Sequence, residues 1–100
     1  MRHHFALVDA IPGKEDQVFQ ALAKFPEVVG KRLLAEKVAN ADIIVMIAAP
    51  DGDGAQKIIS GKLRGISGVM SIRTVMPEHT IAPKVGKLVM EMEKEARAPR

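Results

Sequence analysis

Residues 28–50, VVGKRLLAEKVANADIIVMIAAP, decide the fold of this chain. They contain two strand-like runs, one from Val28 to Val38 and one from Ile43 through Ala49, joined by the short loop 38–42. The second run is apolar at every position from Ile43 to Ala48. Side chains alternate between the two faces of a strand, so a strand without polar alternation is expected to be covered on both faces. Because the helices of so short a chain are expected to cover one face, we predict a partner surface on the other.

The composition is that of a single globular domain. The chain has 100 residues, of which 47% are hydrophobic and 27% charged, and this balance argues against disorder. The absence of cysteine excludes disulfides, thiolate metal sites and a cysteine nucleophile. No apolar run has the length of a membrane span, and the N-terminus does not resemble a signal peptide. We therefore expect a cytoplasmic protein.

The net charge does not indicate nucleic-acid binding. Of the formal charge of +3, the segment 84–100 contributes +2, from five basic and three acidic side chains, so the body is nearly neutral. Nucleic-acid binders usually carry a clustered basic face. We predict no direct nucleic-acid partner and no membrane partner.

Two helices and two further strands flank the central pair. A strand Phe5–Ile11 is expected to end at a Pro12–Gly13 turn, and a helix from about Lys14 to Pro26 should follow. After the central strands we expect a turn at residues 50–54, a helix from Ala55 to about Arg64, and a strand Val69–Met76. The order βαββαβ predicts a ferredoxin-like α+β sandwich with both helices on one face of an antiparallel sheet. The other face would form a dimer interface, assigned to Ile43, Ile44, Val45, Met46 and Ile47.

The tail is predicted to be a separate amphipathic element. We divide the chain into a domain of residues 1–78 and a C-terminal linker and helix of residues 79–100. Within Lys84–Arg97, apolar residues recur at helical spacing, at Val85, Leu88, Val89 and Met92. This helix is expected to pack on its own domain or on that of a twin. The alternatives are a docking helix for another protein and a membrane-surface helix, and three glutamates argue against the latter.

Three short motifs resemble a known family. They are Pro12-Gly13-Lys14-Glu15, Asn40-Ala41-Asp42-Ile43-Ile44-Val45 and Ile66-x-Gly68-Val69-x-Ser71-x-x-Thr74. Their order and spacing resemble the effector-binding (RAM) domain of Lrp/AsnC transcription regulators over about residues 3–78. The resemblance implies a dimeric α/β barrel type of fold that dimerises sheet to sheet, assembles into higher oligomers, and binds small effectors, usually amino acids, between dimers.

Two departures from the family pattern bear on function. Ala39 stands where the family usually has glycine, and Ala41 stands at the position of a large, usually aromatic residue, while Asp42 is kept. Because only two residues precede the first expected strand when it is matched to the family, the chain resembles a stand-alone form without the helix-turn-helix. Such a form could join a full-length Lrp/AsnC-type regulator in mixed oligomers.

The predicted ligand-binding residues follow from that resemblance. For Asp42, contact with a ligand ammonium and capping of the loop backbone are both open. Cross-strand hydrogen bonding is the competing interpretation for the two hydroxyl residues. Three cations, Lys31, Arg32 and Arg73, either neutralise a ligand carboxylate or are ordinary surface charges. The full set of predicted ligand contacts is Asn40, Ala41, Asp42, Ser71 and Thr74.

Other chemistries are less well supported. The run Asp51-Gly52-Asp53-Gly54 does not have its glycine at the position that a calcium-binding loop requires. The histidines His3, His4 and His79 lack the spacing of metal ligands, so we predict no metal and no cofactor. The alternative function is a small dimeric enzyme of the cofactorless monooxygenase type, which needs a polar residue in a cavity between sheet and helices. No His, Tyr or Trp lies in any expected strand after residue 4. We therefore predict a binding module rather than an enzyme.

Overall fold

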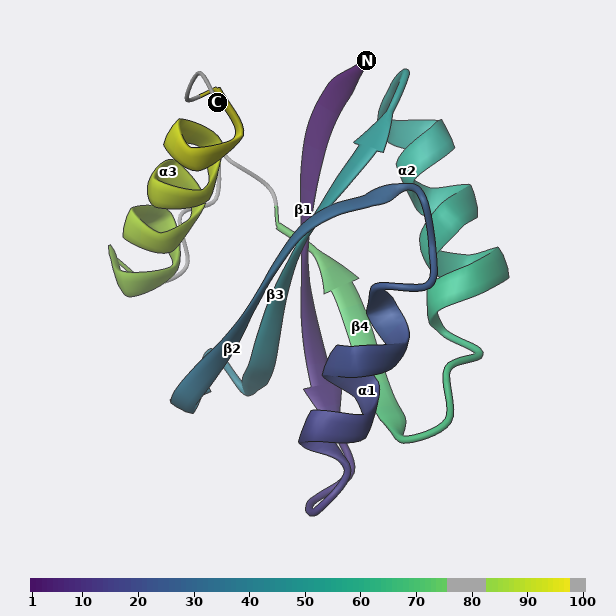
Figure 1. Ribbon diagram of the computed structural model, residues 1–100, viewed down its shortest axis with the longest axis vertical. Helices are drawn as coiled ribbons and strands as arrows, with labels where there is room; N and C mark the ends of the chain where they lie inside the picture. The colour runs from purple at the N-terminus through teal and green to yellow at the C-terminus, as the bar shows by residue number, and fades with distance from the viewer. Residues whose placement is uncertain (76–82, 98–100) are drawn as a thin grey trace.

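The computed structural model describes residues 1–75 and 83–97 as a four-stranded antiparallel sheet with helices (Figure 1). The strands lie in the order β2-β3-β1-β4, so the first and third strands of the chain form the centre of the sheet. The ferredoxin-like α+β fold predicted from the sequence is confirmed. The elements are β1 (Arg2–Ala10), α1 (Glu15–Leu22), β2 (Val28–Val38), β3 (Ala41–Ala49), α2 (Gly52–Ile58), the π-helix η1 (Ile59–Leu63), β4 (Val69–Thr74) and α3 (Pro83–Arg97).

Several boundaries differ from the prediction. Strand β1 begins at Arg2, and helix α1 ends at Leu22 rather than continuing to Pro26. Helix α2 begins before Ala55 because the Asp51 carboxylate caps it, accepting the Gly54 N–H at 2.7 Å. The predicted end of the last strand, Met76, lies outside the described residues, as do the boundary at residue 78 and the linker that begins at residue 79.

One face of the sheet packs against α1, α2 and η1, as predicted. Helix α1 contributes Val18 and Leu22, and η1 contributes Ile59 and Leu63, all fully or almost fully buried. Burying aliphatic side chains of this size removes apolar surface from water at roughly 25 cal/mol per Å². The sheet contributes alternate residues of its strands to this first core, namely Ala6, Val8, Ala10, Ile43, Val45, Ile47 and Ile72.

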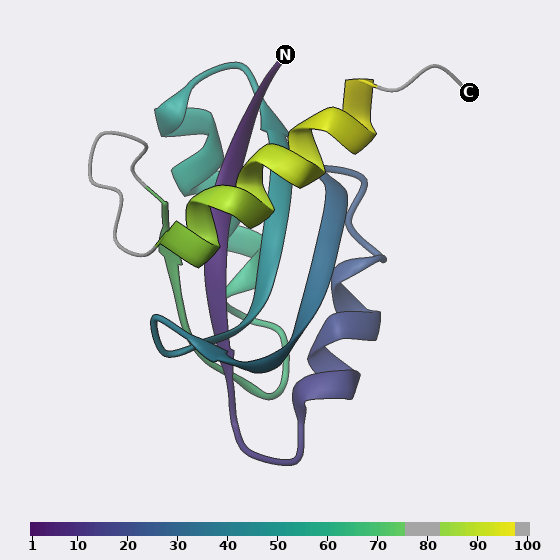
Figure 2. The same ribbon diagram turned by 90° about the vertical axis from the view of Figure 1, so that its left-hand side faces the viewer.

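The other face of the sheet is covered by α3, which crosses it obliquely (Figure 2). Val85 and Met92 of α3 are 3% and 4% exposed and pack in a second core with Leu7, Ile44 and Met46. The expectation that this face is bare within one chain is therefore wrong. The predicted tail helix is confirmed, and its apolar stripe lies on its own sheet.

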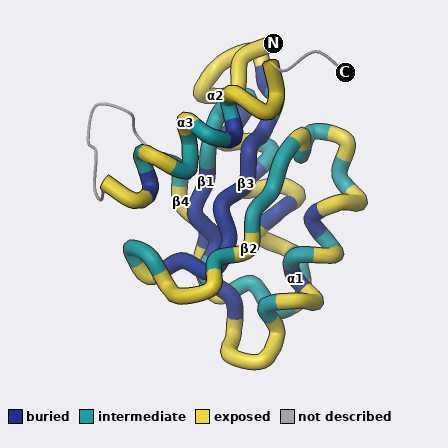
Figure 3. The backbone as a smooth tube through the Cα atoms, turned by 60° about the vertical axis from the view of Figure 1, so that its left-hand side comes forward, coloured by how far each residue is buried: buried dark blue, intermediate teal, exposed yellow. Residues whose placement is uncertain are grey.

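Strand β3 is consequently buried on both sides within one chain (Figure 3). Every residue from Ile43 to Ile47 is at most 2% exposed. The even-numbered residues of this run face α3 and the odd-numbered ones face the other helices. A dimer through the predicted interface Ile43–Ile47 stays a prediction, and it would require α3 to leave the sheet.

Polar contacts at the edges add to the attachment of α3. The Arg32 guanidinium of β2 pairs with Glu95 and, at 3.2 Å, with Glu91. His3 Nδ1 of β1 lies 2.8 Å from Glu93 Oε1. These groups are partly exposed, so the apolar stripe contributes most of the stabilisation. No helix of the described ranges 1–75 and 83–97 is long and apolar enough to cross a membrane.

Candidate functional site

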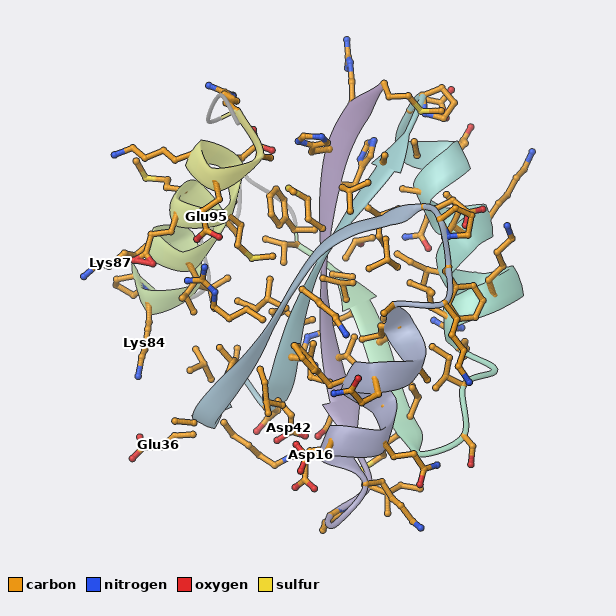
Figure 4. All side chains as sticks on the ribbon, in the orientation of Figure 1. Asp16, Glu36, Asp42, Lys84, Lys87 and Glu95 are labelled. Atoms are coloured by element: carbon orange, nitrogen blue, oxygen red, sulfur yellow. The ribbon has the colours of Figure 1, made fainter. Side chains whose placement is uncertain are left out.

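A row of polar side chains crosses one end of the sheet on the face that carries α3. In the antiparallel register Val8 lies opposite Ile43 and Asp9 lies opposite Ser71, so Asp42, Asp9 and Ser71 follow one another across β3, β1 and β4. Residues directly opposite in antiparallel strands project to the same face. Figure 4 shows Asp42 at the lower end of the sheet, well away from Glu95 of α3. We call Asp9, Lys37, Asp42, Ser71 and Arg73 the polar row.

Lys37 of β2 joins the two carboxylates of the polar row. Its Nζ donates to Asp9 Oδ1 at 2.5 Å and to Asp42 Oδ2 at 3.2 Å. The side chains of Asp9 and Asp42 are only 16% and 10% exposed, whereas that of Lys37 is 50% exposed. The hydrogen bond to Asp9, with a smaller contribution from Asp42, raises the pKa of Lys37 above its ordinary value. The ammonium therefore stays charged, and it is the most exposed member of this group of three side chains.

Asp42 also holds the backbone of the neighbouring strand. The register of β1 against β4 shifts between Asp9 and Ala10, and the Ala10 N–H donates to Asp42 Oδ2 at 2.9 Å. Ala10 is fully buried, so this carboxylate satisfies a donor that water does not reach. The capping interpretation of Asp42 thus has a geometric basis, although the backbone that it binds belongs to β1 and not to its own loop.

The turn between β2 and β3 consists of two residues with left-handed backbones. Ala39 and Asn40 have φ values of 52° and 61°, as a two-residue hairpin turn requires. Asparagine adopts this region readily, whereas alanine is strained there, and glycine is the usual solution. The Arg73 guanidinium of β4 donates to the Ala39 carbonyl and so connects the turn to the far strand.

The structure brings together only part of the predicted ligand set. Asp42 and Ser71 lie in the polar row, and exposed Asn40 lies in the adjoining turn. The side chain of Ala41 is fully buried in the second core and is closed to a ligand. Thr74 lies opposite Ala6, whose side chain packs in the first core, so Thr74 and Ser71 project to opposite faces of the sheet.

Thr74 belongs to a different hollow, on the α2 side of the sheet. This hollow of about 170 Å³ is lined by His4, Gln56 and Thr74 together with apolar residues. Gln56 Nε2 donates to Thr74 Oγ1 at 3.4 Å. The Nε2 atom of His4 is buried and has no hydrogen-bond partner among the described residues. His4 is thus a polar group between sheet and helix that the sequence analysis did not place there, although its alternation with Ala6 and Val8 would have indicated this face.

The remaining predicted cations have partners within the chain. Lys31 Nζ donates to the Phe19 carbonyl at 2.6 Å and lies 4.0 Å from the centroid of the Phe19 ring. Lys31 thus supplies a cation near the C-terminal end of α1, which has no basic residue of its own in its last turn. Arg32 pairs with α3, as described above. Neither cation belongs to the polar row.

Lys37 is the main residue of this site that the sequence analysis missed. It lies five positions before Asp42 across the two-residue turn, and that spacing is the signal that could have indicated a contact. The described residues contain no group of three or more His, Asp or Glu side chains that could hold a metal ion. The polar row therefore offers two carboxylates, two cations and a hydroxyl.

No known protein family and no curated protein sequence matches this chain in sequence. Solved structures do match it. The structure of FFRP-DM1 superposes with a TM-score of 0.65 at 24% identity over 75% of this chain and 96% of that one. The transcriptional regulator from Neisseria meningitidis solved in complex with L-Met gives 0.60 at 20% identity, over 76% of this chain and 50% of that one. The likeness establishes the fold.

The predicted resemblance to the effector-binding domain of Lrp/AsnC regulators is confirmed for the fold. The chain spans about half the length of the regulator that binds L-Met. The Escherichia coli Tat proofreading chaperone NapD also shares the fold, with a TM-score of 0.56 at 19% identity over 75% of each chain. Proteins with this fold thus include a transcriptional regulator and a chaperone, so the function has to be argued from the site.

Proposed function

We propose that this domain is a regulatory effector-binding and self-associating module whose effector is an α-amino acid bound at the polar row. The observation that carries the proposal is the pair of largely buried carboxylates, Asp9 and Asp42, that share the ammonium of Lys37, whose side chain is half exposed. A buried carboxylate pair requires a cation close by. The chain supplies one on a flexible stem, and a ligand ammonium has the same chemistry.

The proposed binding mode exchanges one ammonium for another. The ligand ammonium takes the place of Lys37 Nζ and donates to Asp9 and Asp42, while Lys37 swings into solvent. The ligand carboxylate then pairs with Arg73, whose guanidinium is already held near the turn by the Ala39 carbonyl. Ser71 adds a hydroxyl between the two charged ends. This arrangement matches a zwitterion and disfavours ligands that carry only one of the two charges.

Likeness to known proteins supports the class of ligand. One of the regulators with this fold was solved with an amino acid, L-Met. Because Ala39 and Ala41 depart from the family pattern, which amino acid binds has to be determined by titration.

Calorimetric titration of the twenty amino acids tests the proposal. Asp9→Asn removes one charge-assisted hydrogen bond and should weaken binding about 10- to 100-fold, as expected for the loss of about 1.5–3 kcal/mol. Lys37→Met removes the internal competitor and should tighten binding. Thr74→Ala, on the opposite face, is the matched control and should leave the affinity unchanged. Unaltered affinity in both Asp9→Asn and Lys37→Met would refute the site.

The proposal includes the chain itself and a regulator as partners. We propose homodimers that assemble further, and mixed assemblies with a full-length Lrp/AsnC-type regulator that would supply the contact with DNA. Light scattering of the chain with and without its best amino-acid ligand measures the first. Co-elution of the chain with such a regulator tests the mixed assembly. If the two proteins do not co-elute, the module acts without a regulator.

A small dimeric enzyme of the cofactorless monooxygenase type, with a polar residue acting as acid or base, is the competing proposal. It is favoured by His4, the only titratable side chain among the described residues that line the hollow beside α2. An enzyme would consume a compound that it binds, and His4→Gln would abolish the turnover. A binding module returns its ligand unchanged, so recovery of the intact ligand after prolonged incubation supports the effector proposal.

A further inference from the structure

The outer edge of β2 is the longest free strand edge of the sheet. β2 runs for 11 residues, and among residues 1–75 and 83–97 it pairs only with β3, because it is the terminal strand in the sheet order. Its outward backbone N–H and C=O groups are therefore available to another strand. The opposite edge, β4, has only 6 described residues.

The cations that usually protect such an edge are directed elsewhere. Charged side chains, lysine above all, commonly discourage edge-to-edge pairing. In β2, Lys31 reaches α1, Arg32 reaches α3, and Lys37 reaches the carboxylates of the polar row. Two large apolar residues of the strand, Val29 and Leu33, remain 48% and 39% exposed. The edge is thus both unpaired and partly apolar.

The neighbouring helix does not close the space beside this edge. Two hollows, of about 190 and 420 Å³, lie between β2 and α3, and Arg32 lines both of them. The first lies against Met46 and Met92, and the second against Leu34 and Leu88. Both hollows lie along the strand, the first mainly polar and the second mainly apolar in its lining, and we call them together the β2–α3 groove.

The groove carries charges of both signs. Glu36 and Lys84 line the larger hollow from opposite sides, one from β2 and one from α3, and Figure 4 shows both on the same flank of the molecule. A two-fold interface brings the same patch of each copy together, so a patch that contains both signs can complement itself. An acidic or a basic partner would meet like charge at one of the two residues.

We propose that the β2 edge and the β2–α3 groove form a self-association surface for a second copy of this chain. The two β2 strands lie antiparallel, their apolar residues at Val29 and Leu33 are covered, and Glu36 of each copy faces Lys84 of the other. This surface differs from the predicted interface Ile43–Ile47 and leaves α3 in place. The inference rests on the self-association part of the proposed function and not on amino-acid binding.

Sedimentation velocity of the full chain over a range of concentrations tests the surface. The wild type should dimerise reversibly, and Leu33→Lys should raise the dissociation constant at least tenfold, because the added charge occurs twice in the dimer. Met70→Lys, at an exposed residue on the opposite edge, is the matched control and should leave the dimer unchanged. Circular dichroism verifies that each variant is folded.

A mixing experiment separates contacts between copies from contacts within one copy. Glu36→Lys and Lys84→Glu each place like charges in the groove, so each variant should be more monomeric than the wild type. Mixed in equal amounts they restore both intermolecular pairs and should associate again, although neither intramolecular pair is restored. A mixture that stays monomeric, a wild type monomeric at every concentration, or equal effects of Leu33→Lys and Met70→Lys would each overturn the inference. Amino-acid titration of the same samples reports the effector site independently.

Discussion

Replacing Asp42 with alanine should destabilise the fold more than any other change in the polar row. The substitution leaves the Ala10 N–H without its acceptor at a position that is fully buried. An unsatisfied buried donor costs about 1–3 kcal/mol, and loss of a hydrogen bond to a charged group lies at the upper end of that range. The ion pair with Lys37 adds little, because the lysine is half exposed. We therefore expect the free energy of unfolding to fall by about 2–3 kcal/mol.

Urea unfolding followed by circular dichroism measures this change. Two variants serve as controls. Asp42→Asn keeps an oxygen acceptor for the Ala10 N–H and should lose only about 1 kcal/mol. Asp9→Ala removes the other partner of Lys37 but no backbone acceptor, so its effect should be smaller than that of Asp42→Ala. For a domain of this size, 1 kcal/mol corresponds to roughly 4–8 °C in the melting temperature, so thermal unfolding resolves the series. Equal stability of Asp42→Ala and Asp9→Ala would refute the structural role of Asp42.

Three further predictions concern the two cores and the surface. Gly68→Ala places a Cβ 2.9 Å from a Val18 methyl at a residue whose φ is +98°, so the free energy of unfolding should fall by at least about 1–2 kcal/mol. The Cβ of Gly61→Ala meets nothing within 4 Å, and this control should be neutral or stabilising in the same urea assay. Met92→Ala empties part of the second core and should cost about 2–5 kcal/mol, and an unchanged stability would mean that α3 does not pack on the sheet in solution. The hydrogen bond from Lys62 lowers the pKa of Glu27 in the folded state. The stability that this ion pair adds is therefore fully present above the ordinary pKa of 4.5, and it is lost as the pH falls through the lower pKa of the folded state. Glu27→Gln should therefore flatten the acid limb of stability against pH, and an unaltered limb would contradict this.

The fold could be predicted because local patterns and topology agree. The apolar run at Ile43–Ala48, the helical spacing in α1, and the turn residues at Pro12–Gly13 each indicate the element that the structure contains. The prediction that β3 is covered on both faces is confirmed, whereas the expectation that one of these faces is bare within a single chain is wrong. A strand apolar on both faces does need two covers, and the sequence pattern does not show whether the second belongs to the same chain. The second cover is the apolar stripe of α3 at Val85 and Met92. The periodicity of that stripe predicts a buried helix face, but it does not show which surface the face packs against.

The candidate site was predictable to a smaller degree. Asp42 and Ser71 were placed in it from the resemblance, and the register brings them to one face. Thr74 was grouped with Ser71, although residues three apart in a strand project to opposite faces. Lys37 was missed because a lysine in an edge strand is usually solvated, and only the tertiary structure shows that its ammonium lies between two carboxylates. Contacts of this kind depend on distances across strands, which sequence spacing alone does not fix.

The exchange of Lys37 for a ligand ammonium is the central claim, and the side-chain pKa of Lys37 tests it most directly. The ε-carbon chemical shift of Lys37, followed by NMR through an alkaline titration, reports this pKa with and without the best-binding amino acid. In the free protein the hydrogen bond to Asp9 raises the pKa. We predict that saturating ligand returns it toward the ordinary value of lysine, because the side chain is released into solvent. A ligand that binds while the pKa of Lys37 stays raised would contradict the account.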